Sequence, residues 1–272
     1  SLRLAKYVAL VFPKFLLNTP EFSTTRAELA QKSVDAILDF GEKGFPGILV
    51  ETIAIFINNL AAPANTKVFS LTHRLHLTQP QAYIFDPELP YWIIYRNQLF
   101  DSVCRKLDFD VFEVFRDRQL TNKLLSSSGE LRVLKSRNLS DDGKEILDIP
   151  GYDSYISYAA AKPLSVFQYL DAPNVYLTPN MTYKPRMMKK PPHCVVNGSL
   201  AILIPKGGIV PTEKQLAYFS SEEYRAFYQI ARNFQTRSLN VDACSVFFYG
   251  LLRDEAKPAP EKFDTSVQLS FL

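Results

Sequence analysis

The sequence has few cysteines and no long apolar run. Its three cysteines, Cys104, Cys194 and Cys244, lie far apart and form no CxxC pair, which argues against a disulfide framework and against a zinc ribbon. No apolar stretch approaches the roughly 18 residues that a membrane-spanning helix needs, and the first residues do not read as a signal peptide. We therefore expect a cytoplasmic protein without a membrane partner.

Motifs of self-sufficient catalysis are also missing. The chain contains no P-loop, no GxSxG, no HExxH and no GxGxxG after a strand. His73 and His76 have HxxH spacing without an acidic or cysteine ligand nearby, which favours a polar sheet edge over a metal site. The glycine-rich segment 41–47 lies between two predicted strands, so we expect a hairpin turn there instead of a phosphate-binding loop.

What remains is an ordinary globular composition, with 47% hydrophobic and 22% charged residues in 272. The formal net charge is only +3, from 31 Lys and Arg against 28 Asp and Glu. Such a small excess permits an acidic partner without requiring one. Whether the chain favours an acidic partner therefore depends on how the charges are distributed along it.

The first 60 residues predict a strand, a helix, a strand, a turn and a further strand. Residues 7–12 form a continuous apolar run, which is typical of a parallel-sheet strand covered on both faces. Thr19 and Pro20 can begin a helix that reaches about Val34. Apolar stretches at 36–40 and 48–57 then flank the glycine-rich turn. This outline is the closing half of an α/β sheet that ends in an antiparallel pair.

The pattern changes between residues 61 and 80, where proline interrupts short, aromatic, strand-like pieces. We therefore predict two domains, 1–70 and 71–272, the second of mixed α+β class. Near its end, Ser220 and Glu223 predict a capping box, and an apolar stripe of helical spacing over 224–234 predicts a packed helix. Residues 245–252 read as a last buried strand or short helix.

Positive charge gathers in two parts of the second predicted domain. Residues 116–137 carry six Lys and Arg, and residues 172–212 contain no acidic side chain at all. Contact with nucleic-acid phosphates needs Lys and Arg without competing carboxylates, and the 172–212 segment meets that requirement. A run of Lys and Arg is more often a solvated surface, so the charge pattern alone allows a nucleic-acid partner without identifying double-stranded DNA.

Several segments resemble the late motifs of a known enzyme family. They are Val8–Lys14, Thr25-Arg26, Ile37–Gly41 through Phe45, and Glu51–Phe56. Together they resemble the region after the catalytic loop in adenine-specific N6 DNA methyltransferases of type II restriction-modification systems. The segments 115–118, 133–138, 183–187 and 232–237 look like the target-recognition region of the same group. The resemblance implies a Rossmann-like methyltransferase sheet over 1–70 and a DNA target-recognition domain over 71–272.

Two elements of that family are absent. The chain has neither the glycine-containing loop that binds S-adenosylmethionine nor the Asn/Asp-Pro-Pro-Tyr/Phe loop that holds the flipped adenine. The most similar segment, residues 190–193, has a lysine at the position where the family motif needs a hydrogen-bond acceptor. By resemblance both loops belong to a catalytic half that precedes residue 1. We therefore expect no catalytic and no cofactor-binding residue in this chain, and no methyl-transfer activity of the chain alone.

DNA-binding residues are predicted from side-chain chemistry and from the resemblance. Arg can read guanine, and Asn or Gln can read adenine, in the major groove. The base-reading candidates are Arg186, Asn197, Gln235 and Arg237, with Arg232 beside them; those for the phosphate clamp are Arg132, Lys135, Arg137, Lys184, Lys189 and Lys190. Arg137 could equally pair with Asp141 or Asp142. We expect Lys189→Glu together with Lys190→Glu to weaken duplex binding without unfolding the chain.

Two alternatives stay open. The chain could be a non-catalytic DNA-specificity subunit that works with a separate methyltransferase or nuclease. It could also belong to a bifunctional enzyme that carries a nuclease, although no metal-binding carboxylate cluster is evident in the sequence. A cognate restriction endonuclease is a further expected partner. Upstream coding sequence that contains the glycine loop and Asn-Pro-Pro-Tyr would favour the hypothesis of an enzyme fragment over that of a separate specificity subunit.

Overall fold

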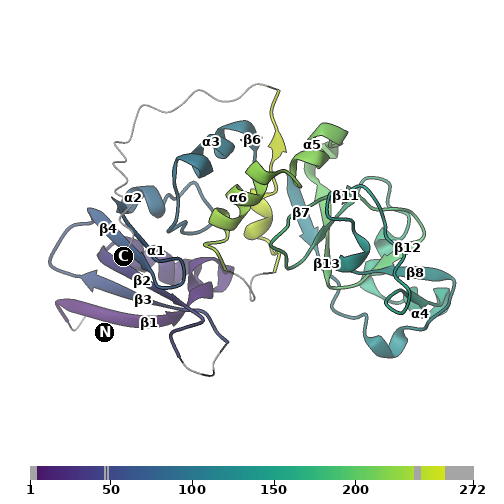
Figure 1. Ribbon diagram of the computed structural model, residues 1–272, viewed down its shortest axis with the longest axis horizontal. Coiled ribbons are helices and arrows are strands. Elements are labelled where there is room, and N and C mark those ends of the chain that lie inside the picture. The colour runs from purple at the N-terminus through teal and green to yellow at the C-terminus, as the bar shows by residue number, and fades with distance from the viewer. Residues whose placement is uncertain (1–4, 46, 48, 236–239, 255–272) are drawn as a thin grey trace. The chain divides into compact units, whose positions relative to one another are not determined.

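The computed structural model describes residues 5–45, 47, 49–235 and 240–254, which form two compact units. The first unit takes the described residues up to Arg105 and residues 229–235. The second takes 106–228 and 240–254. Both contain sheets and helices, so the protein is of mixed α/β class with several sheets (Figure 1).

The first unit is built on one five-stranded sheet with the order β1-β3-β2-β4-β5 (Figure 1). β3 runs antiparallel to both β1 and β2, so β1 and β2 point the same way, and β4 continues parallel to β2. The turn between β2 and β3 confirms the predicted hairpin. The strands are β1 (Tyr7–Pro13), β2 (Ser33–Gly41), β3 (Thr52–Asn58), β4 (Asn65–Ser70) and β5 (Leu75–Pro80).

β1 differs from its prediction in two respects, the first being that it pairs antiparallel with β3 instead of lying between parallel strands. The run forms a strand as expected, but it is not covered on both faces, because only Val8 of its seven residues is buried. The reason is position: β1 lies at the end of the sheet and pairs only with β3 among the described strands. An apolar run alone cannot distinguish a central strand from an apolar edge strand.

The connection from β1 to β2 is helical but shorter than predicted. It consists of η1 (Lys14–Leu17), η2 (Pro20–Phe22) and α1 (Ser23–Ala30). The helix ends at Ala30 because Ser33 and Val34 already pair with β3 as part of β2. Thr19 does not cap through its side chain, which donates to the Phe15 carbonyl instead.

A buried polar network joins the carboxyl ends of β1 and β2. The Lys14 ammonium lies 2.7 Å from Asp39 Oδ2, and both side chains are at most 2% exposed. Tyr95 donates to the same carboxylate oxygen at 2.5 Å, and the Gly41 amide donates to Asp39 Oδ1 at 2.9 Å. Burial, together with the Lys14 charge, lowers the pKa of nearby His73. The network fixes where the glycine-rich turn leaves the sheet.

The first unit extends beyond the predicted boundary at residue 70. β4 and β5 belong to the same sheet as β2, and they are followed by α2 (Gln81–Ile84) and α3 (Gln98–Lys106). Gln81 ties this extension to the sheet, because its side chain accepts from the Val34 amide at 2.8 Å. The structural division therefore falls after Arg105.

The second unit contains two small sheets and a two-stranded ladder. A four-stranded sheet has the order β11-β10-β13-β7, and a three-stranded sheet the order β12-β8-β9. The remaining ladder pairs β14 with β6. The strands are β6 (Leu107–Asp108), β7 (Phe112–Phe115), β8 (Leu131–Leu134), β9 (Ser154–Ile156), β10 (Tyr176–Pro179), β11 (Met188–Lys189), β12 (Cys194–Val196), β13 (Leu200–Pro205) and β14 (Leu251–Leu252).

Aliphatic side chains fill the space around these sheets. Val133, Leu177, Val195 and Ile202 from four different strands share one core and are at most 1% exposed. The unit also contains short helical elements, which are η3 (Asn122–Leu124), η4 (Ser136–Asn138), α4 (Tyr158–Ala161), η5 (Ser165–Tyr169), η6 (Lys206–Gly208), α5 (Glu213–Tyr218) and η7 (Ser245–Phe248). Segment 245–252 was predicted to be a buried strand or a short helix. It contains both, since the short helix η7 is followed by the strand β14.

The predicted packed helix is α6 (Glu222–Ala231). Its stripe of Tyr224, Phe227, Tyr228 and Ala231 is at most 1% exposed, which confirms the packing. The cap differs by one residue, because Ser221 Oγ accepts from the Tyr224 amide at 3.1 Å. Glu223 does not complete a capping box; it pairs with Lys106 instead.

Candidate nucleic-acid interface

The predicted DNA-contacting residues of the second unit divide into paired and exposed side chains. The sheets determine this division, since alternate residues of a strand face opposite sides. Arg132 lies on β8 and Lys189 on β11. The others lie in the loops that follow or precede these strands.

Arg132 has internal partners. Its guanidinium pairs with Asp148 Oδ1 at 2.6 Å and with Asp153 Oδ2 at 2.9 Å, and it donates to the Leu147 carbonyl at 2.7 Å. Burial alone would raise the pKa of Asp153, but hydrogen bonds from Ile149 and Asn138 and the charge of Arg132 lower it. This cluster fixes the 147–153 loop beside β8.

Lys135 and Arg137 both lie against the ring of Tyr152. The Lys135 ammonium donates to the Tyr152 carbonyl and to Ser154 Oγ, and it lies 4.0 Å from the ring centroid. The Arg137 guanidinium lies 4.7 Å from the same centroid, and the residue is exposed. Within the described residues Arg137 makes no ion pair, so the alternative pairing with Asp141 or Asp142 is not observed. Its hydrogen-bonding groups stay accessible to a ligand.

The loop 180–187 displays Lys184 and buries Arg186. The Lys184 ammonium is 51% exposed and lies 2.7 Å from Asp141, whose pKa this hydrogen bond lowers. Arg186 is only 8% exposed, and it donates to the carbonyls of Lys184, Ser136 and Leu139 at 3.0–3.3 Å. Burial lowers the pKa of its guanidinium. Arg186 thus holds the base of a loop whose tip exposes Tyr183.

Lys189 and Lys190 are adjacent but point to different environments. Lys189 is exposed and makes no ion pair with any described residue. Lys190 is 4% exposed, and its ammonium donates to the carbonyls of Leu170 at 2.7 Å and Pro191 at 2.9 Å. Burial lowers the pKa of Lys190. The alternation of side chains along the extended chain separates the two.

The remaining candidates are placed less favourably for contact. Asn197 is half-buried, and its Oδ1 accepts from the Ser199 amide at 2.8 Å. Arg232 and Gln235 are buried in the first unit, at 5% and 6% exposure. Arg237 lies outside the described residues. Asn233, between Arg232 and Gln235 in sequence, donates to the Trp92 carbonyl at 2.7 Å, so this segment packs within the first unit.

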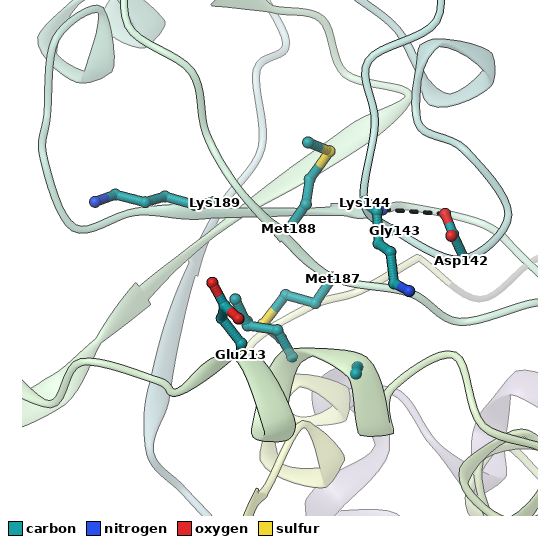
Figure 2. Close-up of a pocket in the computed structure, with 9 residues that line it drawn as sticks. Asp142, Gly143, Lys144, Met187, Met188, Lys189 and Glu213 are labelled. Atoms are coloured by element: carbon teal, nitrogen blue, oxygen red, sulfur yellow. Dashed lines mark hydrogen bonds between the residues drawn. The ribbon is translucent and has the colours of Figure 1, made fainter.

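A cavity of about 470 Å³ lies where β11 passes α5 and the 142–144 turn (Figure 2). Its apolar lining is mainly methionine and aliphatic, and its charged groups are two lysines and two carboxylates. Figure 2 shows Lys189 extending along one side, with Lys144 and Asp142 together on the other. The lining consists of Asp142, Gly143, Lys144, Met187, Met188, Lys189, Glu213, Leu216 and Ala217.

Lys144 is the exposed cation that the sequence reasoning missed. It lies outside the acid-free segment, and Asp141 and Asp142 precede it, so composition did not mark it. The turn holds the Asp142 carboxylate through local hydrogen bonds, because Asp142 Oδ1 accepts from the Lys144 amide at 3.2 Å and from Ser140 Oγ at 2.7 Å. Gly143 is required there: its φ is +72°, and a Cβ would lie 3.0 Å from the Met187 carbonyl. No sequence signal short of contact information would have shown that Lys144 and Lys189 line the same cavity.

Over the described ranges, no group of three or more His, Cys, Asp or Glu side chains is arranged to hold a metal ion. A search of the same residues for a helix long and apolar enough to cross a membrane finds none. Arg137, Lys144, Lys184 and Lys189 are exposed arginine and lysine side chains of the second unit around the 140–144 turn and the 180–190 segment.

Comparison with known proteins finds no match in sequence and a distant likeness among solved structures. No protein-family model matches the sequence, and no curated protein matches it. One similar solved structure is that of the type IIG restriction endonuclease BpuSI, at 8% identity and a TM-score of 0.33. The match covers 90% of this chain and 39% of that one, so this chain spans well under half of that enzyme's length.

Proposed function

We propose that this chain is the DNA-recognition part of a site-specific DNA adenine N6-methyltransferase of a type II restriction-modification system. In this proposal the second unit binds duplex DNA and presents a flipped adenine to a catalytic half outside this chain. That half binds S-adenosylmethionine and supplies the methyl group. The adenine specificity, the cofactor and the Rossmann-like character of the first unit rest on the motif resemblance of the sequence.

One structural observation supports DNA contact. Lys189 is exposed and has no carboxylate partner among the described residues, and it lies in a 41-residue stretch of sequence that contains no Asp or Glu. Bringing such an unpaired ammonium to a phosphate costs little free energy, since no internal ion pair has to break. Arg137 is a second exposed cation without an ion pair among the described residues, whereas Lys184 is paired with the exposed carboxylate of Asp141.

The buried candidates take supporting roles in this proposal. Arg186 fixes the loop that presents Tyr183 and Lys184, and Arg132 fixes the loop after β8. Lys190 anchors the chain next to Lys189 through two carbonyl oxygens. Of the base-reading candidates, Arg237 lies outside the described residues and keeps that role in this proposal. Arg is the side chain that pairs bidentately with guanine.

A salt titration of duplex binding tests this proposal. If Arg137, Lys144, Lys184 and Lys189 each contact a phosphate, log Kd should change with log salt with a slope of about 3–4. Affinity should then fall on the order of 100-fold between 50 and 200 mM salt. A flat dependence would remove phosphate contact from the account.

The variant Lys189→Glu locates the surface. We expect affinity to fall on the order of tenfold and the salt slope to fall by about 1, because one phosphate contact is lost. Lys67→Glu is the matched control, since Lys67 is an exposed lysine of β4 in the first unit and gives the same change in net charge. Equal effects of the two variants would show only a response to net charge. Lys190 is left unchanged, because a glutamate there would face two carbonyl oxygens.

A non-catalytic specificity subunit remains the second candidate, favoured by the absence of both catalytic loops from the sequence. The two readings agree on DNA binding and differ on the polypeptide that carries the chemistry. Adding a separately produced catalytic half should restore methylation of adenine in the first case. In the second case no upstream sequence with those loops exists.

A further inference from the structure

The cavity between β11 and α5 has the size of a small-molecule site. Its volume is about 470 Å³, and ligand pockets in proteins typically measure about 300–1,000 Å³. A water molecule takes up only about 30 Å³ in the liquid, so the cavity is too large for a single water or ion. All of its lining residues belong to the second unit, and its walls are therefore described within one unit.

Two lysines flank this cavity on opposite sides (Figure 2). Lys144 and Lys189 are exposed, and neither ammonium forms an ion pair with a described residue. The Asp142 carboxylate accepts instead from the Ser140 hydroxyl and from the Lys144 amide. Figure 2 shows the Lys144 ammonium extending away from that carboxylate. The cavity thus has one cation on each side, which suits a ligand with two separate anionic groups.

The surface between the two lysines is apolar. Met188 and Leu216 are half-buried, and Met187 is 1% exposed. Figure 2 shows both methionine side chains between Lys189 and Lys144. Methionine thioethers make favourable contacts with aromatic rings, and their flexible side chains adapt to different ring shapes. This lining therefore favours a ligand whose middle part is a flat ring.

One carboxylate lines the same cavity without a partner. Glu213 begins α5 and is exposed, and its carboxylate has no hydrogen bond or ion pair within the part of the chain that the structure describes. An ionised carboxylate can only accept hydrogen bonds, so it favours a ring that carries an amino group. Cytosine, adenine and guanine carry one, and carboxylates pair with N4 of cytosine. Thymine has none, and its ring N–H lies between two carbonyl oxygens that a carboxylate repels.

We propose that this cavity holds one unstacked nucleotide. Its base lies over Met188 and Leu216 and donates an amino hydrogen to Glu213. The phosphates on its 5′ and 3′ sides lie at Lys144 and Lys189. Unstacked bases are held in proteins by hydrogen bonds to their polar edge and by contact with apolar side chains, and the lining supplies both. This inference rests on the proposed function for the source of the nucleotide, which is a strand of bound DNA.

Deoxycytidine 3′,5′-bisphosphate is a small probe with this chemistry, because it carries one phosphate on each side of an amino-bearing base. We expect it to bind the full chain about tenfold more tightly than deoxycytidine 5′-monophosphate, since it engages a second ammonium. It should also bind about tenfold more tightly than thymidine 3′,5′-bisphosphate, which lacks the amino group. Isothermal titration calorimetry measures all three ligands.

Deoxycytidine 5′-diphosphate distinguishes a strand from a free nucleotide as the source of the ligand. It carries two phosphates on the same side of the sugar, so it cannot place one at each lysine. We expect it to bind no more tightly than the monophosphate. Binding as tight as that of the bisphosphate would identify a free nucleotide as the ligand and would overturn the proposal.

Single substitutions assign the charged groups. Lys144→Ala and Lys189→Ala should each abolish the advantage of the bisphosphate over the monophosphate. Glu213→Ala should abolish the preference for cytosine over thymine. Lys214→Ala is the matched control and should change neither, since Lys214 is an exposed lysine of α5 outside the lining of the cavity. Circular dichroism of each variant establishes that it is folded.

Ala217→Trp tests the cavity without a change in charge. Ala217 lines the cavity from an exposed position on α5, so an indole there takes the space of the base. We expect binding of the bisphosphate to fall about tenfold. Unchanged binding in the folded variant would show that the phosphates bind at the surface alone, and the cavity would then not be the site.

The outcomes separate this inference from the proposed function. Absence of bisphosphate binding, or equal binding of the cytosine and thymine forms, overturns the nucleotide site, while salt-dependent duplex binding would still support DNA recognition. Bisphosphate binding that follows the predicted pattern, together with duplex binding that is insensitive to salt, would support the cavity as a nucleotide site and contradict the proposed function.

Discussion

At the scale of single residues, adjacency in sequence does not mean equal exposure. Lys189 and Lys190 have the same side chain and the same acid-free surroundings in sequence, yet one is exposed and the other is 4% exposed. The difference follows from the main chain of β11, where Lys189 pairs with Tyr176 while the next side chain turns toward the Leu170 carbonyl. A charge pattern can therefore identify a basic segment without identifying the lysines that contact a ligand.

The variant Lys190→Met should destabilise the fold. It removes a donor from the buried carbonyls of Leu170 and Pro191, which costs about 1–3 kcal/mol in the free energy of unfolding. Lys189→Met is the control and should change that free energy by less than about 0.5 kcal/mol, because its side chain is exposed. Urea unfolding measures both. Equal losses would contradict the assignment of Lys190 as an internal anchor.

At the scale of elements, one buried ion pair connects two strands that run in the same direction. Lys14 follows β1 directly and Asp39 lies near the end of β2, so their contact brings the two carboxyl ends together across β3. Tyr95 and the Gly41 amide use the remaining capacity of the carboxylate. The sequence marked Lys14 and Asp39 only as parts of separate motifs.

Replacing Asp39 by Asn should be strongly destabilising. The substitution keeps the shape but leaves the Lys14 ammonium buried without a countercharge, which costs about 3–5 kcal/mol. Asp35→Asn on the exposed side of β2 is the control and should have little effect. Denaturant unfolding followed by circular dichroism gives the comparison. A loss below about 1 kcal/mol for Asp39→Asn would show that the network does not stabilise the sheet.

At the scale of the whole molecule, the proposed DNA contacts lie in one of the two units. The exposed cations Arg137, Lys144, Lys184 and Lys189 belong to the second unit. Arg232 and Gln235, predicted to contact DNA with the others, are buried in the first unit. Substitutions of these four cations can therefore test the proposed duplex binding without changing a residue of the first unit.

The chain alone should not bind S-adenosylmethionine. The glycine loop and the Asn-Pro-Pro-Tyr loop that would hold it are absent from the sequence. We expect isothermal titration calorimetry to give no binding heat with this chain, and a saturable signal after the catalytic half is added. A micromolar site on the chain alone would contradict the assignment of the cofactor to the other half.

The sequence by itself determined the local elements with strong patterns. The apolar runs predicted β1, β2 and β3, the glycine cluster predicted the hairpin between β2 and β3, and the stripe at 224–234 predicted α6, although the helix ends at Ala231. These features depend on neighbours along the chain. Burial depends instead on contacts between distant residues. Only the tertiary structure placed β4 and β5 in the first sheet, left one face of β1 uncovered, buried Lys190 and Arg186, and brought Lys144 and Lys189 to the lining of one cavity.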